Sequence, residues 1–215
     1  MLVLLSAVAV FSGLLITVSS QIDQEERIVE KQAFGNEPVK IKAIKINKKD
    51  VAAGKKFSGA DDWLNGIRVT VENKSEKNVN HVSVLVVYAR AENDEASKEA
   101  PFGDSITYGV SPFRKSSAPA QVQAIPPGGS VDLFLSEHTY NENNLVLKRL
   151  KYTKSIKKIE LTVEEVGFED GTAWSKGQYW EPDPSNPGQW LRPEQKIGGA
   201  SPGKFFFAKS HTMQR

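Results

Sequence analysis

The chain has 215 residues, a formal net charge of +2 and no cysteine. Hydrophobic residues make up 39% and charged residues 25% of it, which is ordinary for a soluble globular protein. The small net charge argues against nucleic acid as a partner. The lack of cysteine excludes disulfides, thiolate metal sites and cysteine nucleophiles.

The N-terminal segment, residues 1–20, is apolar. No charged residue occurs from Leu2 to Val18, and small side chains at Ser19 and Ser20 precede a polar stretch, as in a signal peptide. The run is also close to the lower limit of about 17 residues for a membrane span. We therefore expect a hydrophobic helix that is either a signal peptide or a membrane anchor. The rest should work outside the cytoplasm, as a periplasmic, cell-surface or secreted protein. A lipoprotein is excluded because lipidation needs a cysteine, and an exported chain without disulfides favours a bacterial source.

Residues 21–38 are polar and mixed in charge, and they are predicted to be a linker to the folded body. Strand signals then begin. Apolar and basic residues alternate over residues 39–46, with one slip of phase at Ala43. Such a slip is what a β-bulge produces, so a bulged strand is predicted here.

Two further runs carry the clearest strand signals. Residues 66–73 alternate between apolar and polar side chains, whereas residues 82–89 are largely apolar on both faces and should lie centrally in a sheet. A short polar connection joins them, which predicts an antiparallel hairpin. Residues 91–119, rich in Ala, Glu, Asp, Ser, Pro and Gly, are predicted to be a long loop or insertion.

The strand pattern continues in the second half of the chain. Strands are predicted at residues 121–125, 130–135 and 159–168, with another slip of phase in the last one. Residues 141–152 are the one predicted helix, with Asn141 as N-cap and basic residues near its C-terminal end. These elements predict an all-β protein: an antiparallel immunoglobulin-like β-sandwich over residues 39–170 with one short helix.

An alternating strand that ends in Asn73 is followed by a polar turn with Ser75, and then by a valine-rich strand at residues 82–88. The turn Pro126-Pro127-Gly128-Gly129 before a later strand belongs to the same pattern. In these features the chain resembles bacterial extracytoplasmic immunoglobulin-like modules of the FxLYD type. The phenylalanine and aspartate of that signature are absent from Leu85-Val86-Val87-Tyr88-Ala89. The resemblance implies an exported sandwich module and assigns no catalytic residue.

Groups that could carry catalysis are scattered along the sequence. The histidines His81, His138 and His211 are far apart, and no nucleophile elbow, phosphate-binding loop or dinucleotide fingerprint occurs. Neighbouring carboxylates could bind calcium or act as acid and base, but such residues in turns are usually solvated. They are Asp61 with Asp62, and Glu165 with Glu169 and Asp170. The second group includes a predicted hairpin turn with Gly171 at positive φ. We predict no catalytic residue, no metal site and no cofactor.

Residues 171–215 are predicted to be an aromatic, Pro/Gly-rich extension that contains a long loop and packs on the sandwich. The predicted ligand-binding residues lie here: Trp174, Tyr179, Trp180, Trp190 and Asp183. Aromatic faces beside carboxylates and amides suit sugar rings or extended peptides. The other interpretation is that the tryptophans fold back to cover the core.

Basic residues gather at residues 40–56 and 148–158, and they would form one anion-facing patch if the two segments are neighbours. Together the observations predict an exported, non-enzymatic β-sandwich protein that binds or assembles with a cell-envelope protein or polysaccharide. A carbohydrate-binding accessory module built on Trp174, Trp180 and Trp190 is one alternative, and a hydrolase without a recognisable motif is another. Membrane contact is expected only through residues 1–20, if they are not cleaved.

Overall fold

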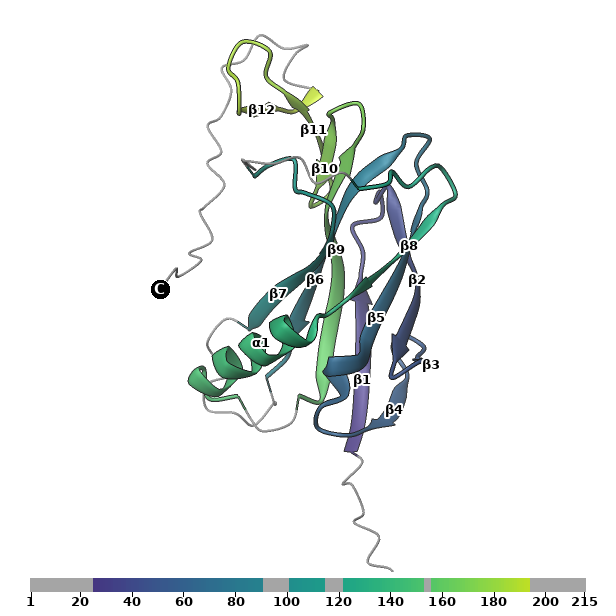
Figure 1. Cartoon of the computed structure of the whole chain (residues 1–215), viewed down its shortest axis with the longest axis vertical. Helices are drawn as coiled ribbons and strands as arrows, with labels where there is room; N and C mark the ends of the chain where they lie inside the picture. The colour runs from purple at the N-terminus through teal and green to yellow at the C-terminus, as the bar shows by residue number, and fades with distance from the viewer. Residues whose placement is uncertain (1–24, 91–100, 115–121, 153–155, 194–215) are drawn as a thin grey trace, which may run out of the picture.

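A computed structural model of the chain describes residues 25–90, 101–114, 122–152 and 156–193. These residues form two β-sheets and one α-helix (Figure 1), which confirms the mostly β architecture with a single short helix. The predicted signal peptide or anchor, residues 1–20, lies outside the described residues. Within the described ranges, no helix is long and apolar enough to cross a membrane.

The larger sheet is built around its longest strand, β9. Its members are β1 (Glu25–Gln32), β4 (Lys56–Gly59), β6 (Val79–Tyr88), β7 (Phe102–Tyr108), β9 (Lys158–Phe168), β10 (Ala173–Ser175), β11 (Gln178–Pro182) and β12 (Trp190–Leu191). Strand β6 pairs with one side of β9 and carries β7 on its own far side. The other side of β9 is shared, because β1 pairs with its first half in parallel and β10 with its second half antiparallel. Strand β4 then extends the sheet from β1, and β11 and β12 extend it from β10.

The smaller sheet is antiparallel and has the order β3-β2-β5-β8. Its strands are β2 (Val39–Ile46), β3 (Lys49–Asp50), β5 (Ile67–Asn73) and β8 (Ser130–Phe134), and the short 3-10 helix η1 (Trp63–Gly66) leads into β5. The register of β2 against β5 shifts between Ile41 and Ala43, so Lys42 is an extra residue. The bulge predicted from the slip of phase is confirmed.

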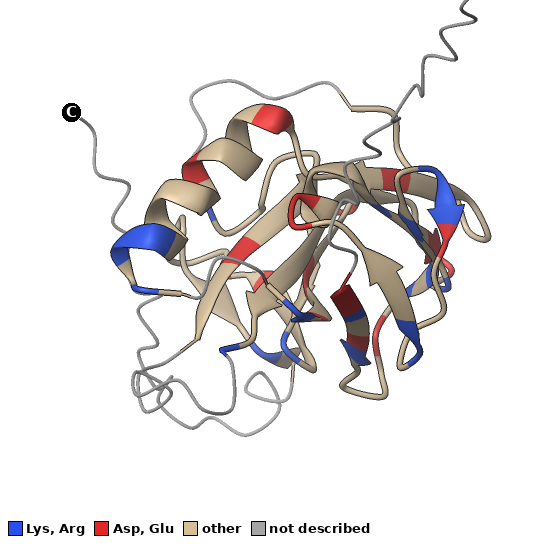
Figure 2. Ribbon diagram, turned by 90° about the horizontal axis from the view of Figure 1, so that it is seen from below, with Lys and Arg blue, Asp and Glu red and all other residues tan. Residues whose placement is uncertain are grey.

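One hydrophobic core lies between the two sheets. It joins inward-facing residues of β5, such as Val69 and Val71, to residues of the larger sheet, such as Val84 and Leu161. Helix α1 (Glu137–Arg149) adds Leu147 to the same core. Figure 2 shows acidic residues toward the start of α1 and basic residues at its end, as the helix dipole favours.

Helix α1 starts earlier than the sequence predicts. The Oγ of Ser136, and not a side-chain atom of Asn141, caps the helix by accepting the backbone N–H of Thr139 at 3.1 Å. Asn143 is buried and donates to the Tyr88 hydroxyl at 3.0 Å. Those contacts attach the helix to the larger sheet.

The predicted hairpin over residues 66–89 is wrong, because β5 and β6 belong to different sheets. The connection is held by Asn73, which is almost fully buried. Its side-chain amide donates to the backbone oxygens of Lys77 at 2.8 Å and Ile125 at 2.9 Å, while its Oδ1 accepts from Ser75. These bonds turn the chain across the core instead of back along the same sheet.

The predicted linker, residues 21–38, contains strand β1, so this prediction is also wrong. Arg27 and Val29 of β1 are buried, with 1% and 0% of their surface exposed. The alternation was hidden because one of the two buried positions is an arginine, Arg27, and the next position in the same phase, Lys31, is an exposed lysine. The sandwich therefore begins before the predicted boundary at residue 39.

Two other predicted loop regions contain strands. Strand β7 lies within the expected loop of residues 91–119. Strands β10 and β11 continue the larger sheet beyond residue 170, so the described part of the C-terminal extension is not a separate appendage. The predicted strand at residues 121–125 is reduced to one bridge between Ile125 and Val79 in the described part.

The order of strands departs from the immunoglobulin arrangement. Before β10, seven strands have five or more residues; counted as A to G they are β1, β2, β5, β6, β7, β8 and β9. The two sheets then hold A, G, D and E on one side and B, C and F on the other. Immunoglobulin constant-type domains divide them as ABED and CFG. This chain and the immunoglobulin domains both have two packed sheets, but they divide the strands between the sheets differently.

Candidate functional site

The five predicted ligand-binding residues do not form one exposed surface. Trp174 is 0% exposed and Trp180 is 8% exposed. Trp174 belongs to the core and packs edge-on against Phe34 at 5.7 Å between ring centroids. Trp180 packs against Phe113 at 6.4 Å, and the guanidinium of Arg192 lies 5.2 Å from its ring centroid. Neither indole can stack on a sugar in this arrangement, which corrects their predicted role.

The remaining predicted residues also have structural partners. Trp190 is partly exposed and packs against Phe113 at 4.6 Å, and Tyr179 is 43% exposed and stacks on Phe168. The carboxylate of Asp183 accepts from the backbone of Ser185 at 2.8 Å and from the side chain of Asn186 at 2.7 Å. The bond from Asn186, followed by that from Ser185, lowers the pKa of Asp183. These contacts make Asp183 a turn former.

His81 lies beside the best candidate carboxylate, Glu165. His81 is 1% exposed, and its Nε2 is 3.5 Å from Oε2 of Glu165. The hydroxyl of Ser111 donates to the same Oε2 at 2.7 Å. Burial opposes ionisation of Glu165, but the nearby His81 imidazole and the hydrogen bond from Ser111 outweigh it and lower its pKa. A catalytic triad needs the histidine between serine and acid. Here both Ser111 and His81 face the acid, so the serine is not activated.

The other predicted catalytic candidates have structural contacts as well. His138 is exposed and lies 3.4 Å from Glu142 on the same helix. Asp170 accepts from Lys77, and Gly171 has φ +82°, which confirms the predicted turn. Among the described residues, no cluster of three or more His, Asp or Glu side chains could hold a metal ion.

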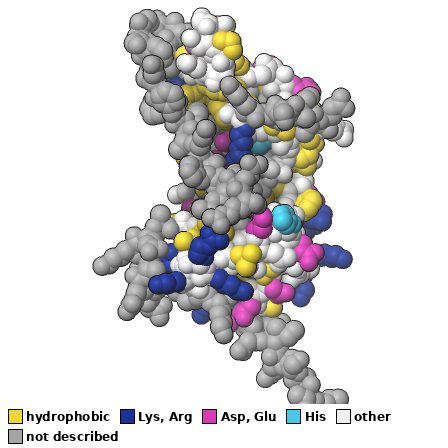
Figure 3. All heavy atoms as spheres, turned by 60° about the vertical axis from the view of Figure 1, so that its left-hand side comes forward, with side chains coloured by type: hydrophobic (Ala, Val, Ile, Leu, Met, Phe, Trp, Pro, Cys, Tyr) yellow, Lys and Arg dark blue, Asp and Glu magenta, His cyan; other side chains and the backbone are white. Residues whose placement is uncertain are grey.

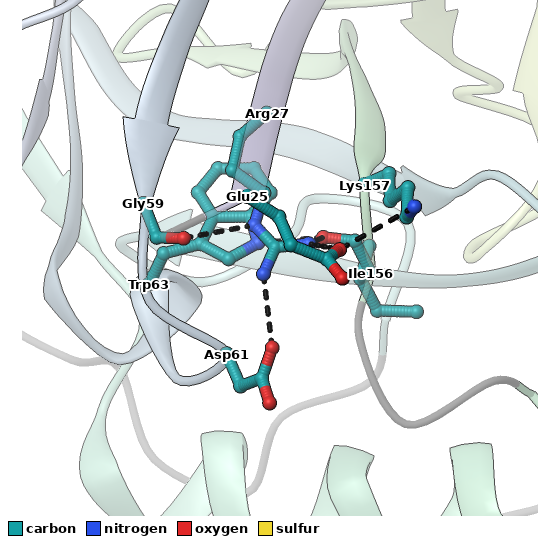
Figure 4. Close-up of polar contacts among 7 residues, drawn as sticks. All are labelled: Glu25, Arg27, Gly59, Asp61, Trp63, Ile156 and Lys157. Atoms are coloured by element: carbon teal, nitrogen blue, oxygen red, sulfur yellow. Dashed lines mark hydrogen bonds and ion pairs between the residues drawn. The ribbon is translucent and has the colours of Figure 1, made fainter. Parts of the chain in front are cut away.

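Arg27 lies at the centre of a buried polar cluster at one end of β1 (Figure 4). Its guanidinium donates to the backbone oxygen of Gly59 at 3.2 Å and to the carboxylate of Asp61 at 2.9 Å. It also contacts Glu25 at 3.2 Å, and the nearby Trp63 indole donates to Ile156 at 2.7 Å. The cluster joins β1, β4, η1 and the start of β9. Its polar groups are occupied by the hydrogen bonds that make these connections.

A groove of about 470 Å³ beside this cluster brings Lys56 next to Lys157 and Lys158. Here the two basic segments of the sequence do meet. Each lysine, however, faces a glutamate: Lys56 lies 2.7 Å from Glu26, and Lys158 lies 2.7 Å from Glu30. Lys157 lies 3.4 Å from Glu25. The charges compensate one another, and the groove is therefore not an anion-facing patch.

A different hollow, of about 280 Å³, opens between the ends of β1 and β2; we call it the slot. It is lined by Lys31, Gln32, Ala33, Glu37, Val39, Lys40, Ile41, Lys74 and Val163. Strand β4 pairs with β1 only up to Ile28, and β3 pairs with β2 only at residues 45–46. The slot thus lies between two strand edges that carry no further strand among the described residues.

The slot combines apolar walls with a positively charged mouth. Val39, Ile41 and Val163, all buried core residues, form the walls. Lys31, Lys40 and Lys74 stand at the mouth. Lys40 makes no ion pair with any described residue, and the Nζ of Lys31 has only a 3.5 Å contact to the backbone oxygen of Ile41.

The carboxylates near the mouth are already engaged. Glu37 accepts the backbone N–H groups of Phe34 and Gly35, so it holds its own loop. Glu72 pairs with Lys74 at 2.9 Å. The hydrogen bond from Lys74 is the main cause that lowers the pKa of Glu72, with help from the charges of Lys42 and Lys40. Lys31 and Lys40 therefore make no ion pair with any described residue, although Lys40 lies opposite Glu72 in the register of β2 against β5.

The loop of residues 33–38 forms the roof of the slot, and the β10–β11 hairpin braces it. The Asn36 side chain donates to the backbone oxygen of Gly177 at 2.9 Å, and Phe34 packs on Trp174. Trp174 thus supports the slot indirectly, by packing against Phe34 of the roof loop. The sequence did not reveal the slot because its residues come from a predicted linker and from strands far apart in the chain.

Comparison with protein-family models, with curated proteins and with solved structures finds no match. The resemblance to FxLYD-type modules therefore stays a prediction.

Proposed function

We propose that this protein is a non-enzymatic binding module of the cell envelope that docks on anionic lipid through the lysines of the slot. The observation that carries the proposal is the pair Lys31 and Lys40, two lysines without an ion pair among the described residues, beside an apolar hollow. The apolar N-terminal segment and the resemblance to FxLYD-type modules support a place outside the cytoplasm, in the periplasm, at the cell surface or secreted. Of the predicted immunoglobulin-like fold, only the general feature of two packed sheets supports the proposal.

Lipid fits the slot better than a hydrophilic polymer does. A polysaccharide would use the lysines but leave Val39, Ile41 and Val163 without a role. A lipid offers both an anionic headgroup and apolar groups. A lysine ammonium is a compact, mobile point charge that suits a phosphate, and each one near an anionic membrane contributes about 1 kcal/mol.

The surface around the slot extends the same charge. Lys42 follows Lys40 on the outer side of β2 and shares Glu72 with Lys74. Figure 3 shows another face of the molecule, where acidic and basic side chains are interspersed. The slot differs from that face because the carboxylates near its lysines already accept other hydrogen bonds or ion pairs.

Vesicle binding tests the proposal. A chain starting at Gln21 is mixed with vesicles of phosphatidylglycerol or of phosphatidylcholine, and the bound fraction is measured by sedimentation. We expect binding to phosphatidylglycerol only, with a loss of about 30-fold for the double variant Lys31→Gln, Lys40→Gln. The matched control is Lys56→Gln, Lys157→Gln, which removes the same charge from the compensated groove. Equal binding to both lipids, or equal losses in both double variants, would refute the proposal.

A further inference from the structure

We infer that the slot holds the alkyl chain of a single-chain anionic amphiphile, with the anionic head between Lys31 and Lys40. The inference rests on the proposed function of the same slot and names its ligand class. The volume of about 280 Å³ sets the chain length. A cavity of about 150 Å³ holds a benzene molecule, so the slot has room for roughly ten carbon atoms.

The walls of the slot supply the apolar contact that such a chain needs. Val39 comes from the smaller sheet and Val163 from β9 of the larger sheet, so the hollow reaches between the two layers. Both side chains are core residues, with 2% and 4% of their surface exposed. Each methylene buried there should tighten binding about fourfold, since burial of one methylene contributes about 0.8 kcal/mol.

The anionic head is held by lysine ammonium groups that make no ion pair with a described residue. To bind it, Lys31 would lose only its 3.5 Å contact with the backbone oxygen of Ile41. An anionic oxygen would replace that contact with a shorter charge-assisted hydrogen bond, about twice as strong as a neutral one. Glu37 does not compete, because the backbone of the roof loop occupies its carboxylate.

An added peptide strand is the competing occupant of this edge. Lys31 on the edge of β1, however, reaches across to β2, with its Nζ 3.5 Å from the backbone oxygen of Ile41. Lysines on strand edges are a device that opposes strand addition. The lining of the slot also includes Val163 of β9, a buried residue that belongs to neither of the two edge strands. The geometry favours an alkyl chain.

Calorimetry with straight-chain carboxylates, kept below their aggregation concentrations, measures the ligand class. We expect no binding of butyrate, about a fourfold gain per methylene up to decanoate, and a plateau beyond it. The variant Ala33→Trp, which places an indole at the exposed rim, should abolish binding. The double variant Lys31→Met, Lys40→Met should weaken it at least tenfold, whereas the matched control Lys56→Met, Lys157→Met, in the compensated groove, should not.

A second measurement keeps the test independent of these variants. On addition of decanoate, the methyl NMR signals of Val39 and Val163 should shift, while those of Val84 on the far part of the sheet should not. Lysophosphatidylglycerol, with one chain and a phosphate head, distinguishes a lipid source from a free fatty acid. Binding of either one with these methyl shifts supports the inference.

Several outcomes would overturn it. Affinity independent of chain length, or unmoved Val163 methyl signals, would exclude an alkyl chain in the slot. Phosphatidylglycerol vesicles that bind while decanoate and lysophosphatidylglycerol do not would end the inference but leave the proposed function standing. Failure of all three would end both. An acidic peptide that protects the β2 edge amides from hydrogen exchange, with the amphiphiles silent, would assign the edge to strand addition instead.

Discussion

At the scale of single residues, the least expected feature is a buried arginine on the first strand. Arg27 is 1% exposed, and its guanidinium donates to Gly59 at the end of β4, to Asp61 shortly after that strand, and to Glu25 of β1. Taking an arginine out of water is costly, and only complete hydrogen bonding offsets that cost. Arg27 therefore fixes how β1, β4 and η1 meet.

Replacing Arg27 by methionine tests this role. The stem of the side chain is kept, but the backbone oxygen of Gly59 and the carboxylate of Asp61 lose their donor, while the oxygen of Ile156 keeps its bond from Trp63. We expect the free energy of unfolding to fall by about 2–4 kcal/mol, measured by urea denaturation. Lys56→Met is the control, since its pair with Glu26 is exposed on both sides and should change stability by less than about 1 kcal/mol. Similar effects in both variants would contradict the argument.

The acid dependence of stability is also set at this scale. Burial acts against ionisation of Asp170, but hydrogen bonds from Lys77 and Thr172 prevail and lower its pKa from 3.8 to about 2. The folded-state pKa is thus below the unfolded one. The stabilisation is present above about pH 4 and is lost as the pH falls toward 2.

The variant Asp170→Asn should therefore flatten the decline in stability between about pH 4 and pH 2. The variant should have a lower free energy of unfolding than the parent at neutral pH, and this difference should shrink as the pH approaches 2. Denaturation curves at several pH values measure this difference. Asp62, which is exposed and makes no ion pair with a described residue, provides a comparison through Asp62→Asn. An identical pH profile for the two variants would exclude a specific contribution of Asp170.

At the scale of elements, the β10–β11 hairpin connects the tryptophans of the sequence to the slot. Trp174 sits in the core and bears on Phe34, while Asn36 binds the turn at Gly177. The hairpin thus supports the roof loop from behind. Its aromatic residues act on the slot through packing, and not by contact with a ligand.

Truncation of Trp174 to alanine should destabilise the protein by about 3–5 kcal/mol, the usual cost of removing a large buried aromatic side chain. Tyr179→Ala is the matched control from the same hairpin, because Tyr179 is 43% exposed. We expect that variant to lose less than about 1.5 kcal/mol. Thermal unfolding measures both. A Trp174→Ala protein of unchanged stability that lost ligand binding would restore the role predicted from sequence.

The elements were predictable where one face is apolar and the other polar. Strand β5 and the bulged β2 follow from alternation alone, and the bulge of β9 appears as a slip of phase. Strand β1 was not predictable, because its buried positions are an arginine and a single valine, Arg27 and Val29. The partner of β5 was not predictable either, since the crossing depends on the buried side chain of Asn73 and not on the length of the turn.

The candidate site was predictable only in its ingredients. Lysines at residues 31, 40 and 74 are visible in the sequence, but their convergence depends on β1 lying beside β9 and β2 above it. The tryptophans were visible too, and the choice between core and binding surface depended on burial. Periodicity reports which face of a strand is apolar, and it does not report which strands are neighbours.

At the scale of the whole molecule, the domain begins with β1. A chain that starts at Glu25 should fold with the stability of the parent, whereas one that starts at Val39 loses β1 and the Arg27 cluster. We expect the shorter chain to lose cooperative unfolding, because it exposes one side of β9 and opens the core at Val29. Circular dichroism during heating measures this. A cooperative transition in the shorter chain would support a linker at residues 21–38.

The parallel pairing of β1 with β9 has a consequence for the order of events during synthesis. Arg27 and its acceptor Ile156 are 129 residues apart in the chain. Strand β1 is synthesised early, but it cannot pair with β9 until β9 has also been synthesised. Contacts between such distant segments slow folding. For an exported chain, as proposed above, that delay would be an advantage, since the chain has to stay unfolded until it has crossed the membrane. The topology itself would hold the sandwich unfinished until β9 has left the ribosome.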